Sequence, residues 1–211
     1  MAIKRLEIEL LSDTTLGRGE GTAGEVDVEV EHDELGLPVA GGKLIRGLLR
    51  DEWLAMREVM RQGLEEAERR IFGQEGETLG ERNILRIGDG VVGEAERAWF
   101  AWAVQGRESR ITSRDVLLSL TEVRRQTSVE RESGAPAETT LRATRVVIRG
   151  LKLHAPLNWL EEPRPEDLRC LALSALGVRH AGLGRHRGRG HVRLALEGDL
   201  KLTRRLAGLE G

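Results

Sequence analysis

Hydrophobic and polar residues alternate along several short stretches of the chain, which is the pattern of half-buried β-strands. The alternation runs from Ile3 to Leu11 and from Val26 to Val30, where acidic residues occupy the second face. Stretches at Asn83–Ile87 and His191–Leu196 also predict strands. Residues 121–157 predict a strand, a polar excursion and a further strand. Strands are therefore expected near both ends of the chain and in its middle.

Apolar residues recur at helical spacing in four other segments. These segments are Lys43–Gln62, Leu64–Phe72, Glu94–Gln105 and Pro165–Val178. The resulting order of strand, helix, strand, long hairpin, strand, helix and strand predicts an α+β fold with a ferredoxin-like (RRM-like) core. We expect a single domain over residues 1–211, with a helical insertion at about 63–115 and a protruding β-hairpin at about 121–146.

Charge is divided unevenly between the two halves of the chain. Residues 1–106 carry 22 acidic and 13 basic side chains, whereas residues 107–211 carry 13 acidic and 20 basic ones, within a net charge of −2. Only four of the 33 basic residues are lysines, and the planar guanidinium of arginine suits forked contacts with phosphate. The basic C-terminal half therefore predicts an anionic partner. The chain has no tyrosine, so we expect a nucleic acid to be held by its backbone rather than by stacked bases.

Two other features narrow the class of protein. No apolar run approaches the ~18 residues of a membrane span, and we expect a cytoplasmic protein without a cleaved leader. The single cysteine, Cys170, forbids an internal disulfide and a CxxC metal site. Its apolar neighbours predict a small buried core residue.

The predicted helix after Gly41 and Gly42 has a basic face, and these two glycines are candidate binding residues too, because they let another backbone come close. At about 100° per residue, five cations fall within roughly 60° of one another, opposite an apolar arc. These cations are Lys43, Arg46, Arg50, Arg57 and Arg61. Free N–H groups at the start of the helix add a positive dipole end, so the face predicts a track for phosphates. The alternative is a solvated helix face with i,i+4 charge pairs.

An acid-free run of arginine, histidine and glycine covers residues 179–193. It holds five arginines, four glycines and three of the five histidines of the chain. Glycines let successive amides turn toward an anion, so the run predicts a contact with a polyanion. The candidate residues are Gly184, Arg185, Arg187, Gly188 and Arg189. A plain flexible turn and a metal site built on His186 and His191 are the alternatives.

The polar excursion at residues 122–142 has strand-like flanks and a middle broken by Gly134 and Pro136. This combination predicts a hairpin that projects from the domain and grips a phosphate backbone. The candidate contacts are Arg124, Arg125, Thr127, Arg131 and Arg142. The alternative is an ordinary surface loop.

These three features occur in the same order in the RAMP proteins of CRISPR effector complexes, which the sequence resembles. The segment Asp33–Arg50 resembles that family's approach to its first helix, with Ala40 replacing the usual proline and Gly42 a usual serine. Residues 126–142 resemble the "thumb" hairpin of the backbone subunits of type III complexes, and residues 179–193 resemble the RAMP glycine-rich loop. The resemblance implies a RAMP core with a protruding thumb, in a backbone subunit of a subtype D-like type III complex.

That resemblance also implies a place in an antiviral ribonucleoprotein. Its partners would be guide (CRISPR) RNA, complementary target RNA, neighbouring RAMP backbone subunits, a large polymerase-like subunit and a small helical subunit. In the family, the first helix and the glycine-rich loop hold guide phosphates, and the thumb flips a base out of the guide–target duplex. Base pairing then reads the sequence while the protein holds the backbone.

Backbone subunits of this family often cleave the target RNA with one aspartate that precedes the first-helix motif, and by position this is Asp27. A carboxylate near a flipped linkage can bind a divalent cation, Mg²⁺ or Mn²⁺, or help to deprotonate a 2′-hydroxyl. The resemblance thus predicts a metal-dependent endoribonuclease with Asp27 as its catalytic and metal-binding residue.

Other interpretations of these residues stay open. Asp27, Glu29 and Glu31 can instead form the wet face of a half-buried strand, and Asp33 has the position of a turn-forming residue. The subunit would then be catalytically silent. A further alternative is an endoribonuclease that processes the guide precursor through the histidines of the glycine run.

Overall fold

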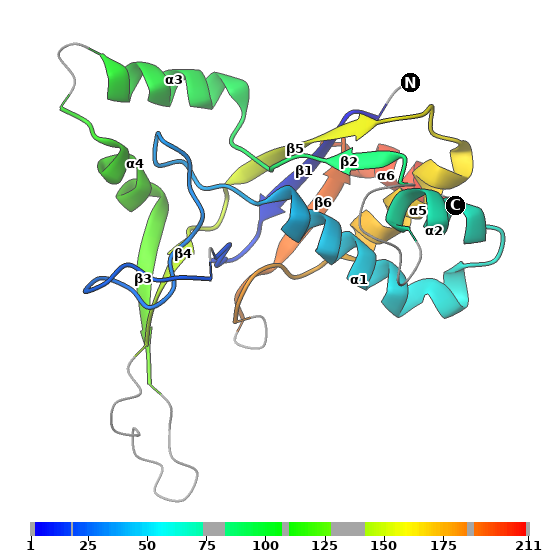
Figure 1. The fold of residues 1–211 in the computed structure, drawn as a ribbon, viewed down its shortest axis with the longest axis horizontal. Helices are drawn as coiled ribbons and strands as arrows, with labels where there is room; N and C mark the ends of the chain where they lie inside the picture. Colours follow the sequence, from blue (N-terminus) through cyan, green and yellow to red (C-terminus); the bar gives the residue numbers. More distant parts are fainter. Residues whose placement is uncertain are drawn as a thin grey trace, which may run out of the picture.

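A four-stranded antiparallel sheet forms the centre of the molecule (Figure 1). The computed structural model describes residues 3–17, 19–73, 83–106, 110–127, 142–184 and 188–209. The strands lie in the order β2 (Leu85–Ile87), β5 (Lys152–Trp159), β1 (Arg5–Leu10) and β6 (Val192–Leu196). Leu6 lies opposite both Ala155 and Leu196. Because alternate side chains of a strand share a face, the apolar residues of these strands point to one side of the sheet.

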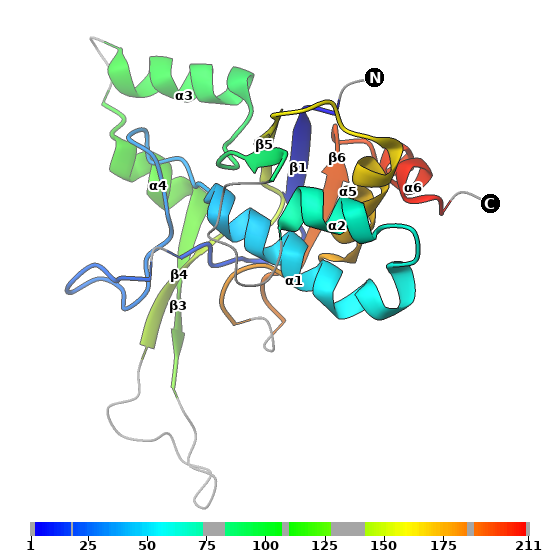
Figure 2. The same ribbon diagram turned by 45° about the vertical axis from the view of Figure 1, so that its right-hand side comes forward.

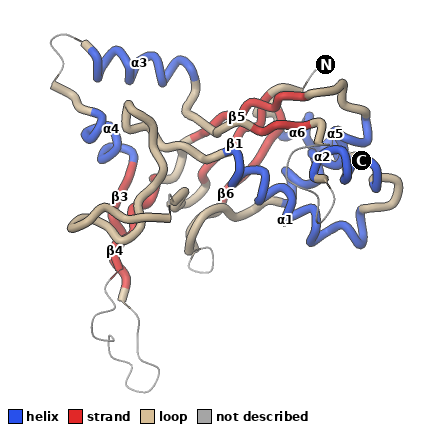
Figure 3. The backbone as a smooth tube through the Cα atoms, in the orientation of Figure 1, coloured by secondary structure: helices blue, strands red, loops and turns tan. Residues whose placement is uncertain are grey.

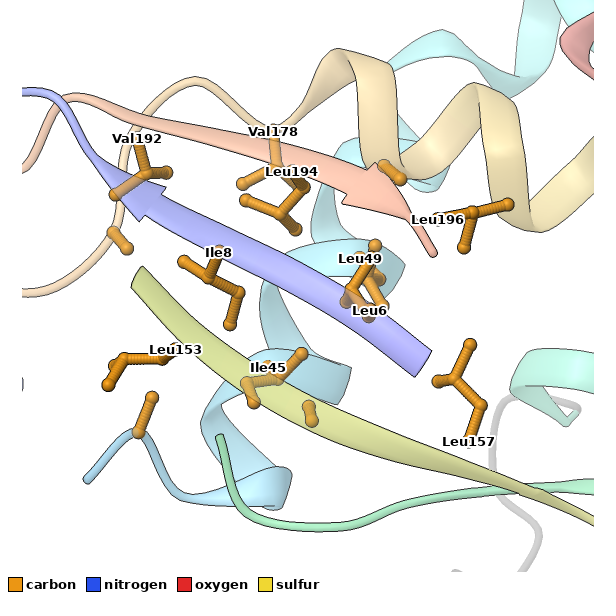
Figure 4. Packing of buried hydrophobic residues seen from close by; sticks show 14 of the residues in the cluster. Leu6, Ile8, Ile45, Leu49, Leu153, Leu157, Val178, Val192, Leu194 and Leu196 are labelled. Atoms are coloured by element: carbon orange, nitrogen blue, oxygen red, sulfur yellow. The ribbon is translucent and has the colours of Figure 1, made fainter. Parts of the chain in front are cut away.

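Helices cover that apolar side. Figure 4 shows Leu49 of α1 (Gly42–Met60) beside Leu6 of β1, and Ile45 of the same helix beside β5. The second covering helix is α5 (Pro165–Gly177), and α2 (Glu65–Phe72) and α6 (Leu200–Ala207) pack beside it. Cys170 of α5 is fully buried, and burial raises the pKa of its thiol. The prediction of a small core residue at Cys170 is confirmed.

The order of elements along the chain gives the topology. β1, α1, β2, β5, α5 and β6 follow one another, and the sheet order is β2-β5-β1-β6. This is the ferredoxin-like arrangement of two split βαβ units. The α+β, ferredoxin-like fold class predicted from the pattern of elements is confirmed.

Ion pairs occupy the open side of the sheet. The Lys152 ammonium lies 3.0 Å from Glu7, and the Arg193 guanidinium lies 3.1 Å from Glu9. RRM domains instead stack bases on aromatic rings of their sheet. The likeness to RRM domains is therefore one of topology, because this face carries paired charges where an RRM carries stacking rings.

A second sheet of two strands projects from the body of the molecule (Figures 1 and 3). β3 (Thr121–Gln126) pairs antiparallel with β4 (Arg142–Val147), so that Gln126 lies opposite Arg142. The strand-like flanks of the polar excursion are confirmed. Two strands follow the excursion instead of the one expected, because Gly150 turns the chain at φ +91° between β4 and β5.

Along the chain, two further helices lie between β2 of the main sheet and β3 of this hairpin. α3 (Glu94–Gln105) has the predicted bounds, and α4 (Ser113–Leu120) leads directly into β3. Within the expected helical insertion, β2 joins the main sheet as an edge strand. No helix in the described ranges is long and apolar enough to cross a membrane.

The strand predicted over Val26–Val30 is wrong. Its residues make isolated bridges with three different partners, Thr22, Thr144 and Gly17, so no continuous ladder forms. The alternative that Glu29 lies on a solvent-exposed strand face is also wrong, because Glu29 is 6% exposed. Glu29 Oε1 accepts a hydrogen bond from Arg145 Nε at 2.8 Å and so joins this segment to β4.

Candidate nucleic-acid interface

The base of the hairpin and the glycine run line one groove, although their lining residues lie 39 to 67 positions apart in the chain. Its volume is about 600 Å³. The segment after β1 brings the two sides together, because Leu11 N donates to His191 O and Thr14 pairs with Val147. The lining residues are Leu11, Ser12, Asp13, Glu122, Arg124, Ile148, Arg149, Gly188 and Arg189.

The three arginines of this groove differ in their partners. Arg124 Nη2 lies 2.7 Å from Asp13 and 2.6 Å from Glu122, and the hydrogen bond with Asp13 raises the pKa of Arg124. Arg149 is exposed and Arg189 is half-buried, and neither forms an ion pair within the described ranges. Arg149 and Arg189 are therefore the cations that this groove leaves for an anion. Arg149 was not among the residues predicted from the sequence, where it is a lone arginine beside Gly150.

The other hairpin residues that were predicted to contact phosphates lie on both faces of the hairpin. Arg142 lies opposite Gln126 and shares a face with Arg124, whereas Arg125 lies opposite Ala143 on the other face. Arg125, Arg142 and Thr127 are exposed. Arg131 lies outside the described residues.

The four glycines of the run have two different structural roles. Gly182 and Gly190 pack against the backbone, since a Cβ on them would collide with the carbonyl oxygens of Thr15 and Ala181 respectively. Nothing comes within 3.7 Å of a Cβ on Gly184, and nothing within 4 Å of one on Gly188. The two predicted binding glycines are thus the open ones. Arg185 and Arg187 lie outside the described residues, as does His186.

Gly182→Ala is expected to lower the free energy of unfolding more than Gly188→Ala does. Both glycines have positive φ, 74° and 72°, so each alanine carries a left-handed backbone cost of about 1–2 kcal/mol. Only the Cβ at position 182 must also displace a backbone carbonyl. Urea unfolding of the two variants measures the difference, and equal losses would contradict this division of the loop.

The basic face of α1 is divided between two roles. Arg57 and Arg61 lie 3.7 and 3.1 Å from Glu68 of α2, so these two cations are charge-paired, with a residue of the neighbouring helix rather than with the i,i+4 partners given as the alternative. Lys43 is exposed and Arg50 half-buried, and neither has an ion pair among the described residues. The phosphate-track interpretation therefore applies to the first half of the helix.

Arg46, which was predicted to bind RNA, has structural contacts. Its guanidinium donates to the carbonyl oxygens of Leu85 (3.3 Å), Ile71 (3.0 Å) and Phe72 (3.2 Å). Burial lowers the pKa of Arg46, and the nearby cations of Arg86 and Arg50 lower it further. These bonds cap the end of α2 and join it to β2.

The N-terminus of α1 already faces a carboxylate. Gly42 N donates to Asp89 Oδ1 at 2.8 Å, and a Cβ on Gly42 would collide with the Ile87 carbonyl oxygen. Gly41 is the N-cap residue, and it has no side chain that could cap the helix. The structure therefore gives Gly42 a packing role, and an anion at this helix end would meet the Asp89 charge.

Asp27 is exposed and held at the base of the hairpin by two bonds to one residue. Its backbone N donates to Ala143 O at 2.8 Å, and its Oδ2 accepts from Ala143 N at 2.6 Å. Asp33 has the turn-forming role expected for it, because its Oδ1 accepts from Leu35 N and Leu37 N at 2.8 and 3.0 Å. Of the two carboxylates, Asp27 is the one beside the hairpin strand.

The described residues do not form a metal site on their own. They contain no group of three or more His, Cys, Asp or Glu side chains that could hold an ion. One oxygen of Asp27 is already bonded to Ala143 N. His180 and His191 stack with ring centroids 5.5 Å apart, beside the glycine run. This donor set does not fit the expected Mg²⁺ or Mn²⁺ centre.

Comparison with known proteins rests on structure. No protein-family model matches the chain, and no curated protein matches it. Solved structures share its fold. A chain of the type III-B Cmr-beta cryo-EM structure in the apo state superposes with a TM-score of 0.66 at 13% identity, covering 93% of this chain and 98% of that one. A chain of the type III-B Cmr-beta structure bound to cognate target RNA gives a TM-score of 0.67 at 11% identity, covering 95% and 98%.

This coverage extends beyond the four-stranded core. At 11–13% identity the likeness establishes the shared fold.

Proposed function

We propose that this chain is a backbone subunit of a type III CRISPR effector complex and that it holds guide RNA by its phosphates. The observation that carries the proposal is the groove in which the hairpin base and the glycine run meet around Arg149 and Arg189. The fold shared with a structure bound to target RNA supports it. An RNA backbone needs cations and open amides rather than stacking rings, and the groove supplies Arg149, Arg189 and the open loop around Gly188.

Further cationic residues and several partners complete the proposal. Lys43 and Arg50 extend the cationic residues along α1, and the exposed Arg125 and Arg142, which lie on opposite faces of the hairpin, are the proposed hairpin contacts with RNA. Neighbouring backbone subunits, a large polymerase-like subunit and a small helical subunit are the proposed protein partners. The complex would act in the cytoplasm on complementary target RNA.

Arg149→Ala and Arg189→Ala are each expected to weaken guide RNA binding about 10- to 100-fold, because a hydrogen bond to a charged group contributes roughly 1.5–3 kcal/mol. The slope of log affinity against log salt concentration should also become shallower, by about 0.7 for each single-strand phosphate that the protein no longer neutralises. Filter binding at several salt concentrations measures both quantities. Arg205→Ala is the matched control, since Arg205 is an exposed arginine of α6 outside the groove. An equal loss of affinity in this control would contradict the proposed site.

We further propose that Asp27 cleaves the target RNA. Its carboxylate takes the proton of a target 2′-hydroxyl, the 2′-oxygen bonds to the adjacent phosphorus, and the bond from phosphorus to the 5′-oxygen breaks. The products are a 2′,3′-cyclic phosphate and a 5′-hydroxyl, which takes up a proton. The exposed position of Asp27 beside Ala143 supports this role, because the hairpin is the element expected to expose the linkage.

A catalytically silent subunit is the second candidate. The two bonds between Asp27 and Ala143 favour it, since they give the carboxylate a structural task at the start of β4. Mg²⁺ or Mn²⁺ remains a prediction in which the RNA and water would have to supply most of the ligands. Processing of a guide precursor by the histidines of the run stays a prediction.

A further inference from the structure

Strand β6 is an edge of the main sheet, and a cavity lies along its outer side, next to α5 and α6 (Figures 1 and 2). The volume of the cavity is about 520 Å³, within the range of about 300–1,000 Å³ that is usual for small-molecule sites. The end of α5, β6 and α6 contribute its lining residues in the described ranges, and β1, the strand that pairs with β6, contributes none. The cavity therefore lies on the side of β6 that has no neighbouring strand.

The backbone bonds at the two ends of β6 show which residues face this outer side. Glu197 N donates to Arg5 O, and Leu11 N donates to His191 O, so the odd-numbered positions of the strand bond to β1. Successive residues of an edge strand direct their N–H and C=O groups to opposite sides. The even-numbered residues of β6 therefore direct these groups away from β1 and toward the cavity.

Two backbone groups on the outer side have no hydrogen bond within the described part of the chain. Val192 N donates to Arg179 O, and Leu196 N donates to Thr203 Oγ1, each at 2.9 Å. Between these two bonds, Val192 O and Leu194 N have no partner among the described residues. Val192 and Leu194 are each 2% exposed, and buried backbone groups are nearly always paired. The strand edge thus leaves an acceptor and a donor side by side for a ligand.

The remaining lining gives the cavity apolar walls around this pair of groups. Figure 4 shows Val178, at the end of α5, beside Leu194. Leu176, Leu200 and Leu209 also line the cavity. Nucleobases carry hydrogen-bond donors and acceptors on one flat edge, and proteins read that edge with polar groups while apolar side chains cover the ring faces. A carbonyl and an N–H two residues further along a strand edge are suited to such a ring.

The cavity is also cationic. Arg179 and Arg204 are exposed lining residues, and neither forms an ion pair within the described ranges. A third lining arginine, Arg193, lies 3.1 Å from Glu9. No acidic side chain is among the described lining residues. Because guanidinium groups bind phosphate through charge and paired hydrogen bonds, Arg179 and Arg204 suit a ligand that carries phosphate.

We propose that this cavity binds a free mononucleotide. The base lies between the apolar side chains and bonds to Val192 O and Leu194 N, and the phosphate bonds to Arg179 and Arg204. The site goes beyond the proposed function, because it is separate from the groove assigned to guide RNA. Among the described lining residues of the two cavities, only Leu11 is common to both.

Isothermal titration calorimetry on the purified full-length chain tests the proposal. The probes are AMP, GMP, CMP and UMP, and the best-bound one is compared with its nucleoside and with inorganic phosphate. We expect one nucleotide per chain, and binding of the nucleoside or of phosphate that is at least about tenfold weaker, because each makes only part of the contacts.

One substitution separates the phosphate contact from the base contact. Arg204→Ala should weaken nucleotide binding about tenfold or more and leave nucleoside binding unchanged, because the arginine contacts the phosphate alone. Arg205→Ala is the matched control, since Arg205 is an exposed arginine of the same helix outside the cavity. In chain labelled with ¹⁵N-leucine, the Leu194 amide resonance should shift on addition of nucleotide. The amide of Leu85, in β2 at the opposite edge of the sheet, should stay in place.

Four results would overturn the proposal. These are no binding of any of the four nucleotides at millimolar concentration, equal losses in Arg204→Ala and Arg205→Ala, an unmoved Leu194 amide, and tighter binding of RNA at the same residues. A short RNA oligomer that competes with the nucleotide tests the last of these, because an RNA strand carries the same base and phosphate chemistry. Displacement at lower concentration than the free nucleotide itself requires would assign the cavity to RNA.

Discussion

Replacing Asp27 by asparagine is expected to lower the rate of target RNA cleavage by about 10²- to 10⁴-fold in the assembled effector, the range of a lost general base. The affinities for guide and target should stay unchanged. The asparagine oxygen can still accept the hydrogen bond from Ala143 N, which Asp27 Oδ2 now accepts at 2.6 Å. What the substitution removes is the negative charge that takes the proton of the 2′-hydroxyl.

This substitution separates the two candidate roles of Asp27. A carboxylate that only holds β4 in place would be replaced by the amide with little loss of cleavage, so wild-type cutting by Asp27→Asn would reject catalysis and favour the silent subunit. Asp27→Ala removes both the base and the acceptor and should lose cleavage together with some stability. Glu20→Gln is the control, since Glu20 is an exposed carboxylate of the same N-terminal segment. Gel analysis of end-labelled target RNA measures the cuts.

Arg145→Leu is expected to lower the free energy of unfolding by about 3–5 kcal/mol, the cost of leaving a buried charge without its partner. Arg145 is 3% exposed and Glu29 is 6% exposed, and Nε and Oε1 lie 2.8 Å apart. The same guanidinium reaches Glu25 Oε2 at 3.4 Å. Because Arg145 ties β4 to the segment that carries Asp27, the variant should also cleave more slowly.

Matched variants test whether burial is the cause. Arg124→Leu removes an exposed arginine from the same hairpin, and exposed ion pairs contribute only about 0–1 kcal/mol. Glu29→Leu combined with Arg145→Leu should restore most of the stability, because no charge is then left buried. Urea unfolding measures all three proteins. If Arg145→Leu were no more damaging than Arg124→Leu, the buried pair would not be the main link between hairpin and N-terminal segment.

Helices that depend on the local spacing of apolar residues could be predicted from the sequence. The bounds of α3 match at both ends, and α1 and α5 differ by one or two residues, because apolar residues repeat at the helical period there. Helices α4 and α6 were missed, although both have local signals. Thr112 and Asp115 form a capping box at α4, and Asp199 accepts from Lys201 N and Leu202 N at α6.

The sequence by itself determined the order of the main elements, the ferredoxin-like class and the regions that carry arginine, because these depend on periodicity and on composition. Only the tertiary structure decided which arginines are available to an anion. Arg46 bonds to carbonyls at the end of α2, and Arg145 pairs with a glutamate more than a hundred residues away, whereas Arg149 and Arg189 meet across one groove. A side chain's partners depend on which distant segments pack beside it, and a single sequence does not display those contacts.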